Sequence, residues 1–294
     1  MTGNKMTLGG GSAIAMAMAA GILTATPAVP GAWETFPTQA NADAWQVYDF
    51  SDGINYLPGW NGSEAGGKYI WRAHTGDQPL IFFADNLPGA GALAGDFNAA
   101  NVGAVSVEVY VEDLDEFEYL DCNVYANGPA GLRFYYSQAY YYDDLEGDGW
   151  QKLEFSFSRP WFYLENGAFI QVADNTAFLS DVKEVGFSFY PRLGTTFNAY
   201  AALDDVKLEP RLAPENLATA LSSGQFQLSF RKGAAVSYQV EKMSDTTPFT
   251  WTPVAGQTGI TGSGPHLFAT PATQGREIFR VVSQPVYTPV VTAP

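Results

Sequence analysis

The middle of the chain consists of short segments in which apolar and polar side chains alternate. In the segment 104–112, the valines at positions 105, 107, 109 and 111 share one parity, and Ser106, Glu108 and Tyr110 share the other. Successive side chains of a β-strand point to opposite faces of a sheet, so such a segment has one apolar and one polar face. The same alternation recurs in 117–125, 151–157 and 185–190. One buried and one solvated face per strand is typical of antiparallel sandwiches, so the pattern predicts an all-β chain.

Nine strands are expected between Trp33 and Pro210. The turn sequences SDG, LPG, NGPAG and EGDG separate them, because glycine, asparagine and aspartate supply the positive φ angles that tight turns need. One short helical turn is expected within 175–185. The expected strands cover residues 44–50, 67–73, 79–84, 104–112, 116–126, 131–138, 150–158, 184–192 and 199–209.

A second β-rich unit is expected after residue 210. Two prolines and a fall in aromatic density mark a linker near 209–215, and short strand-like segments follow it. Their number is sufficient for a small β-sandwich. The expected organisation is a signal-peptide-like leader over 1–28, a larger sandwich over 33–210, a smaller one over 211–284 and a proline-rich tail over 285–294.

The N-terminal segment has the features of an export signal. Lys5 supplies a short basic region, the apolar run 13–25 follows, and small residues suited to cleavage end at Ala28. The apolar run is too short for a convincing membrane span. We therefore expect a secreted, extracellular or cell-surface protein with no membrane span in the mature chain. A leader that stays attached would instead be an assembly element.

Charge narrows the range of partners. The net charge of −16, with 15 basic residues, argues against nucleic acid and against anionic membrane surfaces. Cys122 is the only cysteine, so an intrachain disulfide or thiolate metal cluster is excluded. Its parity with Leu120 and Val124 predicts a buried, inert thiol.

Three stretches of the larger unit resemble the jelly-roll carbohydrate-binding modules of bacterial secreted proteins. They are the opening WETF with WQVYDFSDG, the strand GDGWQKLEFSF and the closing AALDDVKLEP, the last being the most specific. The smaller unit is similar to fibronectin-type-III-like domains through SYQVEKMSDTTPFTWTPVAG and REIFRVV. The resemblance implies an antiparallel jelly-roll β-sandwich followed by a smaller immunoglobulin- or fibronectin-III-like β-sandwich.

The resemblance also implies a structural Ca²⁺ that joins the first and last strands of the jelly roll. Carried over to this chain, it indicates Glu34 or Asp49 together with Asp204 or Asp205. Such a site is physically reasonable, because a hard cation prefers carboxylate and carbonyl oxygens. Alternation places Asp204 in phase with Val206, which favours Asp204 over Asp205. The alternative is a solvated pair of acids at a strand end.

The candidate ligand surface is a set of outward polar and aromatic side chains. Sugar recognition needs flat rings that stack on C–H faces and polar groups that bond hydroxyls. In 131–138, Leu132, Phe134 and Tyr136 are expected to face the core. Trp60, Trp71, Trp150 and Trp161 are expected in the core or at its rim, and Trp161 is the best candidate among them for an exposed ring. The alternative is that exposed strand tyrosines only stabilise cross-strand pairs. The candidate residues are Tyr110, Tyr119, Asp121, Asn123, Tyr125, Arg133, Tyr135 and Trp161.

Catalysis has little support in the sequence. His74 and His266 fall in different units, and no GxSxG, HExxH or phosphate-binding glycine loop occurs. A glycosidase needs only two carboxylates, and nothing singles out a pair among the 31 acids. The favoured hypothesis is a secreted, non-catalytic protein that binds polysaccharide or a cell-surface glycan. The alternative is a structural subunit of an extracellular filament, sheath or surface layer that self-associates through sandwich contacts and a retained N-terminal segment.

Overall fold

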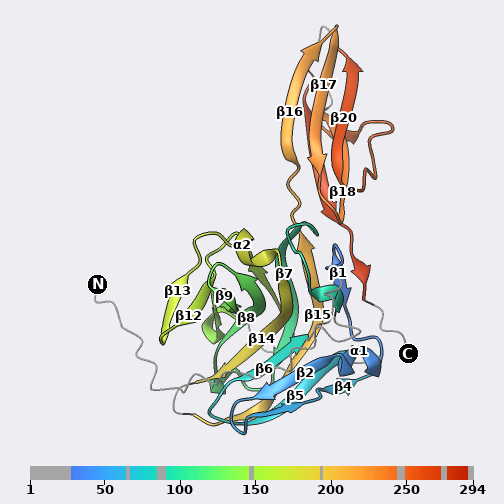
Figure 1. The fold of residues 1–294 in the computed structure, drawn as a ribbon. Helices are drawn as coiled ribbons and strands as arrows, with labels where there is room; N and C mark the ends of the chain where they lie inside the picture. The colour runs from blue at the N-terminus through green and yellow to red at the C-terminus, as the bar shows by residue number, and fades with distance from the viewer. Residues whose placement is uncertain are drawn as a thin grey trace.

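The computed structural model describes residues 28–63, 67–84, 91–145, 149–192, 195–243, 249–272 and 277–290. The expected leader, apart from Ala28, and the last four residues of the expected tail lie outside these ranges. Within them the chain consists mainly of β-strands, as the alternation predicts. A larger unit of curved sheets carries a smaller, elongated unit that projects from it (Figure 1). None of the described helices is long and apolar enough to span a bilayer.

One sheet of the larger unit has seven strands in the order β11-β7-β15-β1-β22. The long strand β15 pairs with β7 along one edge, and with β5 and then β1 along the other; β4 pairs with β5. The strand bounds are β1 Ala32–Glu34, β4 Gly59–Asn61, β5 Tyr69–Gly76, β7 Val102–Val111, β11 Gln151–Ser156, β15 Phe197–Pro210 and β22 Thr288–Pro289.

The second sheet of the larger unit has nine strands in the order β13-β12-β9-β8-β14-β6-β2-β3, with β10 paired to β8. Its strands are β2 Trp45–Asp49, β3 Ile54–Tyr56, β6 Leu80–Ala84, β8 Phe117–Gly128, β9 Gly131–Tyr136, β10 Tyr140–Tyr141, β12 Phe162–Glu165, β13 Ala168–Gln171 and β14 Val182–Pro191. Short helical segments connect the strands: α1 Gln39–Asp43, α2 Thr176–Leu179, η1 Gly91–Leu93, η2 Leu114–Glu116 and η3 Tyr142–Asp144.

All nine strands expected in the larger unit are confirmed, with ends that differ by at most a few residues. The helical turn expected within 175–185 is present as α2, although strand β14 already begins at Val182. The short strands β1, β3, β4, β10, β12 and β13 were not expected. Each has five residues or fewer, too short for an alternating pattern to stand out.

The two sheets enclose one apolar core. Val107, Cys122 and Phe187, which lie on strands of both sheets, are fully buried, as predicted. Trp45 stacks on Phe187 with ring centroids 6.4 Å apart and planes 9° apart. Full burial of each such side chain contributes about 1.5–3 kcal/mol of hydrophobic free energy. This core lies between the inner faces of the two sheets, so each sheet has one outer face.

The smaller unit has two antiparallel three-stranded sheets in the orders β16-β17-β20 and β19-β18-β21. Its own core contains Phe230, Tyr238, Val240 and Phe268. Similarity to fibronectin type III domains stays a prediction. The strands are β16 Glu215–Ser222, β17 Gln225–Lys232, β18 Val236–Met243, β19 Trp251–Pro253, β20 Gly264–Pro271 and β21 Phe279–Pro285.

After the smaller unit, the chain returns to the larger one. Strand β22 pairs in parallel with β1, with Thr288 opposite Ala32. Within the expected proline-rich tail over 285–294, Thr288 and Pro289 therefore form an edge strand of the larger unit. Proline is compatible with this position because an edge strand leaves one row of backbone groups unpaired. Asn101 adds to the junction, since its Nδ2 donates to the carbonyls of Arg211 at 3.2 Å and Ala234 at 3.0 Å.

Candidate functional site

Four of the predicted ligand residues share the outer face of β8. Tyr119, Asp121, Asn123 and Tyr125 alternate with the buried Leu120, Cys122 and Val124, as the sequence predicts. Strand β14 runs beside them, with Ser188 opposite Asp121 and Tyr190 opposite Tyr119. On the other side, β9 brings Tyr136 opposite Asn123 and Phe134 opposite Tyr125. We call this surface the first aromatic face; its residues are Tyr119, Asp121, Asn123, Tyr125, Phe134, Tyr136, Ser188 and Tyr190.

The rings of the first aromatic face contact one another across strands. Tyr119 stacks on Tyr190 with centroids 4.2 Å apart and planes 20° apart. Tyr125 packs against Phe134 at 4.8 Å, and Phe134 lies 6.4 Å from Tyr136. Aromatic pairs in such arrangements stabilise a sheet by about 0.5–1.5 kcal/mol each beyond their area burial. The rings are therefore held in place before any ligand arrives.

Polar groups lie between these rings. Asn123 Nδ2 donates to Ser188 Oγ at 2.7 Å. Gly186 lies opposite Asn123 in the neighbouring strand, and a Cβ atom there would lie only 2.7 Å from Asn123 Oδ1. The glycine thus makes room for the amide oxygen. Sequence reasoning assigned no role to Ser188 or Gly186, because small residues on an outer face carry no signal without the register.

Two side-chain oxygen atoms of this face have no hydrogen-bond donor within the described part of the chain. They are Asp121 Oδ1 and Asn123 Oδ1, and both are buried. Their side chains were predicted to face outward, which is correct, but Asp121 is 5% exposed and Asn123 1%. Because a buried acceptor without a donor costs about 1–3 kcal/mol, this pair is the least satisfied feature of the face.

Burial also changes the acidity of these groups. Desolvation raises the pKa of Asp121 to about 7, although the nearby polar side chains of Ser188, Tyr190 and Asn123 oppose the shift. Burial and the nearby Asp121 carboxylate raise the pKa of Tyr136 well above its usual range, and that of Tyr190 likewise. The tyrosines therefore remain neutral hydroxyls around a carboxyl group that titrates near neutral pH.

Three predicted ligand residues are placed elsewhere. Tyr135 lies opposite Val124 and is fully buried, so the expectation that it faces outward was wrong. The reason is the β8–β9 hairpin, whose register reverses the parity assigned to 131–138. Trp161, the best candidate for an exposed tryptophan and a candidate ligand residue, is fully buried, and its Nε1 donates to the Ser156 carbonyl at 3.1 Å. Arg133 is opposite Ala126 and lies over the Tyr163 ring at 4.9 Å, away from the first aromatic face.

Tyr110 belongs to the other sheet. It lies on β7, opposite Ala202 of β15, and contacts Trp150 and Tyr200. Trp71 and Trp150, expected in the core or at its rim, are each 37% exposed. The accessible tryptophans are therefore Trp71 and Trp150 and not Trp161, because the sequence around each one does not reveal what packs over it.

The four predicted calcium ligands are already engaged by other groups. Glu34 is fully buried and accepts from the Phe36 amide at 2.8 Å and from Asn41 Nδ2 at 3.1 and 3.2 Å. Burial raises the pKa of Glu34 to about 7. Asp49 accepts from the Ser51 amide, and its other oxygen lies 2.9 Å from His74 Nδ1.

The aspartates of β15 point in different directions. A β-bulge between Asp204 and Lys207 shifts the register, so the predicted phase between Asp204 and Val206 was wrong. Asp204 lies opposite Glu108, whereas Asp205 accepts from Trp33 Nε1 at 2.6 Å and Lys207 Nζ at 2.7 Å. Among the described residues, no three acidic, histidine or cysteine side chains gather as a metal site. Binding of Ca²⁺ by Glu34 or Asp49 together with Asp204 or Asp205 stays a prediction.

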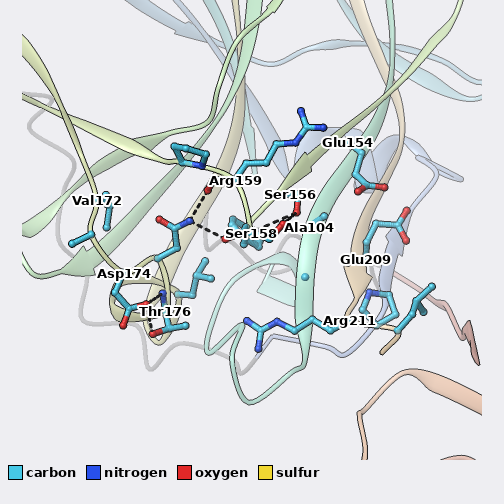
Figure 2. A pocket seen from close by; sticks show the side chains of 18 of the residues that line it. Ala104, Glu154, Ser156, Ser158, Arg159, Val172, Asp174, Thr176, Glu209 and Arg211 are labelled. Carbon is cyan, nitrogen blue, oxygen red and sulfur yellow. Dashed lines mark hydrogen bonds between the residues drawn. The ribbon is translucent and has the colours of Figure 1, made fainter. Parts of the chain in front are cut away.

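A cavity of about 630 Å³ lies where the ends of β11, β13 and β15 meet (Figure 2). Its charged lining includes Glu154, Arg159, Glu209 and Arg211. Glu209 is fixed there, because it accepts from Ser106 Oγ at 2.6 Å and from the Tyr287 hydroxyl. The aromatic ring among the described lining residues is the buried Phe157, so this cavity suits a small polar group better than a stacked sugar.

Comparisons with known proteins give distant similarities. No family model and no curated protein matches the sequence. A β-1,2-glucanase from Parabacteroides distasonis aligns with 90% of this chain at 12% identity and a TM-score of 0.37, and this chain spans 40% of that protein. The L4b domain of human laminin alpha-2 aligns over 61% of this chain and 97% of its own, with 12% identity and a TM-score of 0.41.

A family 11 carbohydrate-binding module from Clostridium thermocellum, solved with a β-1,3-1,4-mixed-linked tetrasaccharide, aligns over 56% of this chain and 88% of its own. The identity is 12% and the TM-score 0.36. These similarities are too distant to assign a role to any residue of this chain.

Proposed function

We propose that this protein is exported and binds a neutral polysaccharide or cell-surface glycan, without cleaving it, through the first aromatic face. The observation that carries the proposal is the pair of buried, donor-less oxygens of Asp121 and Asn123, which lie among tyrosine rings. The leader-like sequence over 1–28 supports export.

The chemistry of a sugar complements this surface. A hydroxyl group that enters between the rings can donate to Asp121 Oδ1 or Asn123 Oδ1, and the cost of an unsatisfied acceptor disappears on binding. The half-buried rings of Tyr119 and Tyr125 offer apolar surface to the C–H face of the same sugar. A net charge of −16 disfavours acidic polysaccharides, so the proposal specifies neutral ones.

Affinity electrophoresis in gels that contain mixed-linkage β-glucan, xylan or mannan tests the proposal. The double variant Tyr119→Ala with Tyr125→Ala should weaken binding at the first aromatic face at least tenfold, which corresponds to about 1.4 kcal/mol. Phe249→Ala is the matched control, because Phe249 is a 64% exposed ring on the smaller unit. Unchanged binding at this face in a folded double variant would contradict the proposal.

A smaller change provides a second test. Gly186→Ala places a methyl group 2.7 Å from Asn123 Oδ1 and must displace the amide, while it leaves every ring in the sequence. We expect it to weaken binding as well. Reducing-end assays on the same polysaccharides should detect no cleavage, and steady release of reducing ends would indicate an enzyme instead.

A further inference from the structure

A second group of aromatic side chains lies on the seven-stranded sheet. Trp71 and Tyr110 both lie opposite Ala202, one on each side of β15. Their neighbours in the strands, Ile70 and Val109, are at most 1% exposed and face the core. Because side chains alternate, these rings are on the outer face of that sheet. We call this surface the second aromatic face; its rings are Tyr69, Trp71, Tyr110, Trp150 and Tyr200.

These five rings form one continuous group over β5, β15 and β7 and over Trp150, the residue before β11. Tyr110 and Tyr200 stack at 5.3 Å with planes 20° apart. Trp150 lies 5.8 Å from Tyr110 and 5.2 Å from Tyr69, and Trp71 lies 6.2 Å from Tyr200. The two tryptophans are each 37% exposed, so the group presents accessible indole surface.

Trp71 lies against the backbone of its neighbouring strand. Gly59 is paired with Trp71, and a Cβ atom at Gly59 would lie 2.5 Å from Trp71 Cε2 and 2.7 Å from Nε1. Only a residue without a side chain lets the indole approach the strand this closely. The indole therefore has one side packed on the backbone and remains 37% exposed. A flat ring held in this way is a surface on which a sugar can stack.

Carboxylates lie beside these rings. Asp204 is opposite Glu108 on the same outer face as Tyr110, and Asp204 Oδ2 lies 3.9 Å from the position of a Cβ at Gly67. Burial raises the pKa of Asp204 to about 7. Carboxyl groups accept hydrogen bonds from hydroxyls and repel anions, so the charges complement a neutral polyhydroxyl ligand.

We infer that the second aromatic face is an independent binding platform for a neutral polysaccharide chain, on the opposite side of the sandwich from the first. The two faces belong to different sheets whose inner faces share one core. A single molecule then holds two polysaccharide chains at once and cross-links them. The inference goes beyond the proposed function in both the site and the valency.

The platform is tested by the double variant Trp71→Ala with Trp150→Ala in the full chain, with Phe249→Ala as the control. In the same three gels, each double variant should retain the binding of the intact face, and a variant that combines all four changes should lose retardation. Gly59→Ala, which forces the indole off the strand, should reproduce the effect at the second face. Near-UV circular dichroism and the melting temperature establish that each variant is folded.

Cross-linking has its own readout. When mixed with soluble mixed-linkage β-glucan, xylan or mannan, the unchanged protein should increase light scattering, and either double variant should abolish the increase.

If the tryptophan double variant and the unchanged protein show equal retardation and equal scattering, the inference is wrong and the proposed function remains intact. If the tryptophan substitutions abolish retardation and the tyrosine substitutions leave it unchanged, the first aromatic face is not a binding site and the protein does not hold two polysaccharide chains. Lack of retardation of the unchanged protein in all three gels would overturn both proposals. If the tryptophan substitutions change the sedimentation coefficient of the protein without polysaccharide, the second aromatic face is a contact between copies of this chain, and the inference is wrong.

Discussion

The buried carboxyl group of Asp121 makes the folded protein less stable as the pH rises, whereas most carboxylates in folded proteins have the opposite effect. Its pKa is about 7 in the folded protein, against an ordinary value of 3.8, because burial disfavours the charged form. Each pKa unit corresponds to about 1.4 kcal/mol, so ionising Asp121 in the folded state costs about 4 kcal/mol relative to the unfolded chain.

The sign follows from proton binding. Below pH 4 both states hold the proton, and Asp121 does not affect the pH dependence. Between pH 4 and 7 the folded state holds a proton that the unfolded state has released, so the free energy of unfolding falls by up to about 1.4 kcal/mol per pH unit. Above pH 7 the loss is complete and constant.

The substitution Asp121→Asn removes this titration and keeps the shape of the side chain. We expect urea denaturation to show that the free energy of unfolding of the variant, relative to that of the unchanged protein, increases by about 4 kcal/mol between pH 4 and pH 8. Some slope remains in the variant, since burial also raises the pKa of Glu34 and Asp204 to about 7. Asp115→Asn, at an exposed acid, is the control. Parallel curves for Asp121→Asn and the unchanged protein would refute the reasoning.

Three further results are expected. Trp161→Ala should destabilise the fold by about 3–5 kcal/mol, because the indole is fully buried, yet leave polysaccharide retention by the folded fraction unchanged in affinity gels. Burial raises the pKa of the Cys122 thiol, so a thiol reagent should label it only after unfolding, and rapid labelling of the native protein would contradict this. Asn101→Ala removes two hydrogen bonds at the junction and should speed proteolysis within 211–214, measured by the rate at which the intact chain disappears.

The core face of the larger unit was predictable because it is encoded locally. Valine alternation in β7 and the Leu120, Cys122, Val124 series in β8 each determine which side is buried without reference to any other strand. Local patterns do not reveal which strands become neighbours. Tyr110 and Tyr119 are close in sequence, yet β7 and β8 lie in different sheets, so the two tyrosines belong to opposite faces.

Other parts depended on register and backbone conformation. Tyr135 can face either side because its ring is apolar and its hydroxyl is polar, and only the pairing of Gly128 with Gly131 determines its parity. The bulge in β15 places Asp205 at φ +55°, a conformation that alternation does not anticipate for aspartate. One signal was present and unused: Asn166 and Gly167, at φ +51° and +78°, join β12 to β13, and Asn-Gly strongly favours such hairpins.

Because β22 pairs with β1, the smaller unit is an insertion within the larger unit. The chain leaves the larger unit after β15 and re-enters it at β22. Asn101 of the larger unit links the two crossing points: its carbonyl accepts from Arg211 N, and its Nδ2 donates to the carbonyl of Ala234, next to Ala235, whose carbonyl accepts from Val286 N. A short bridge in place of 212–285 would therefore keep every strand of the seven-stranded sheet. The same two points offer a place to graft a different module without cutting the sandwich.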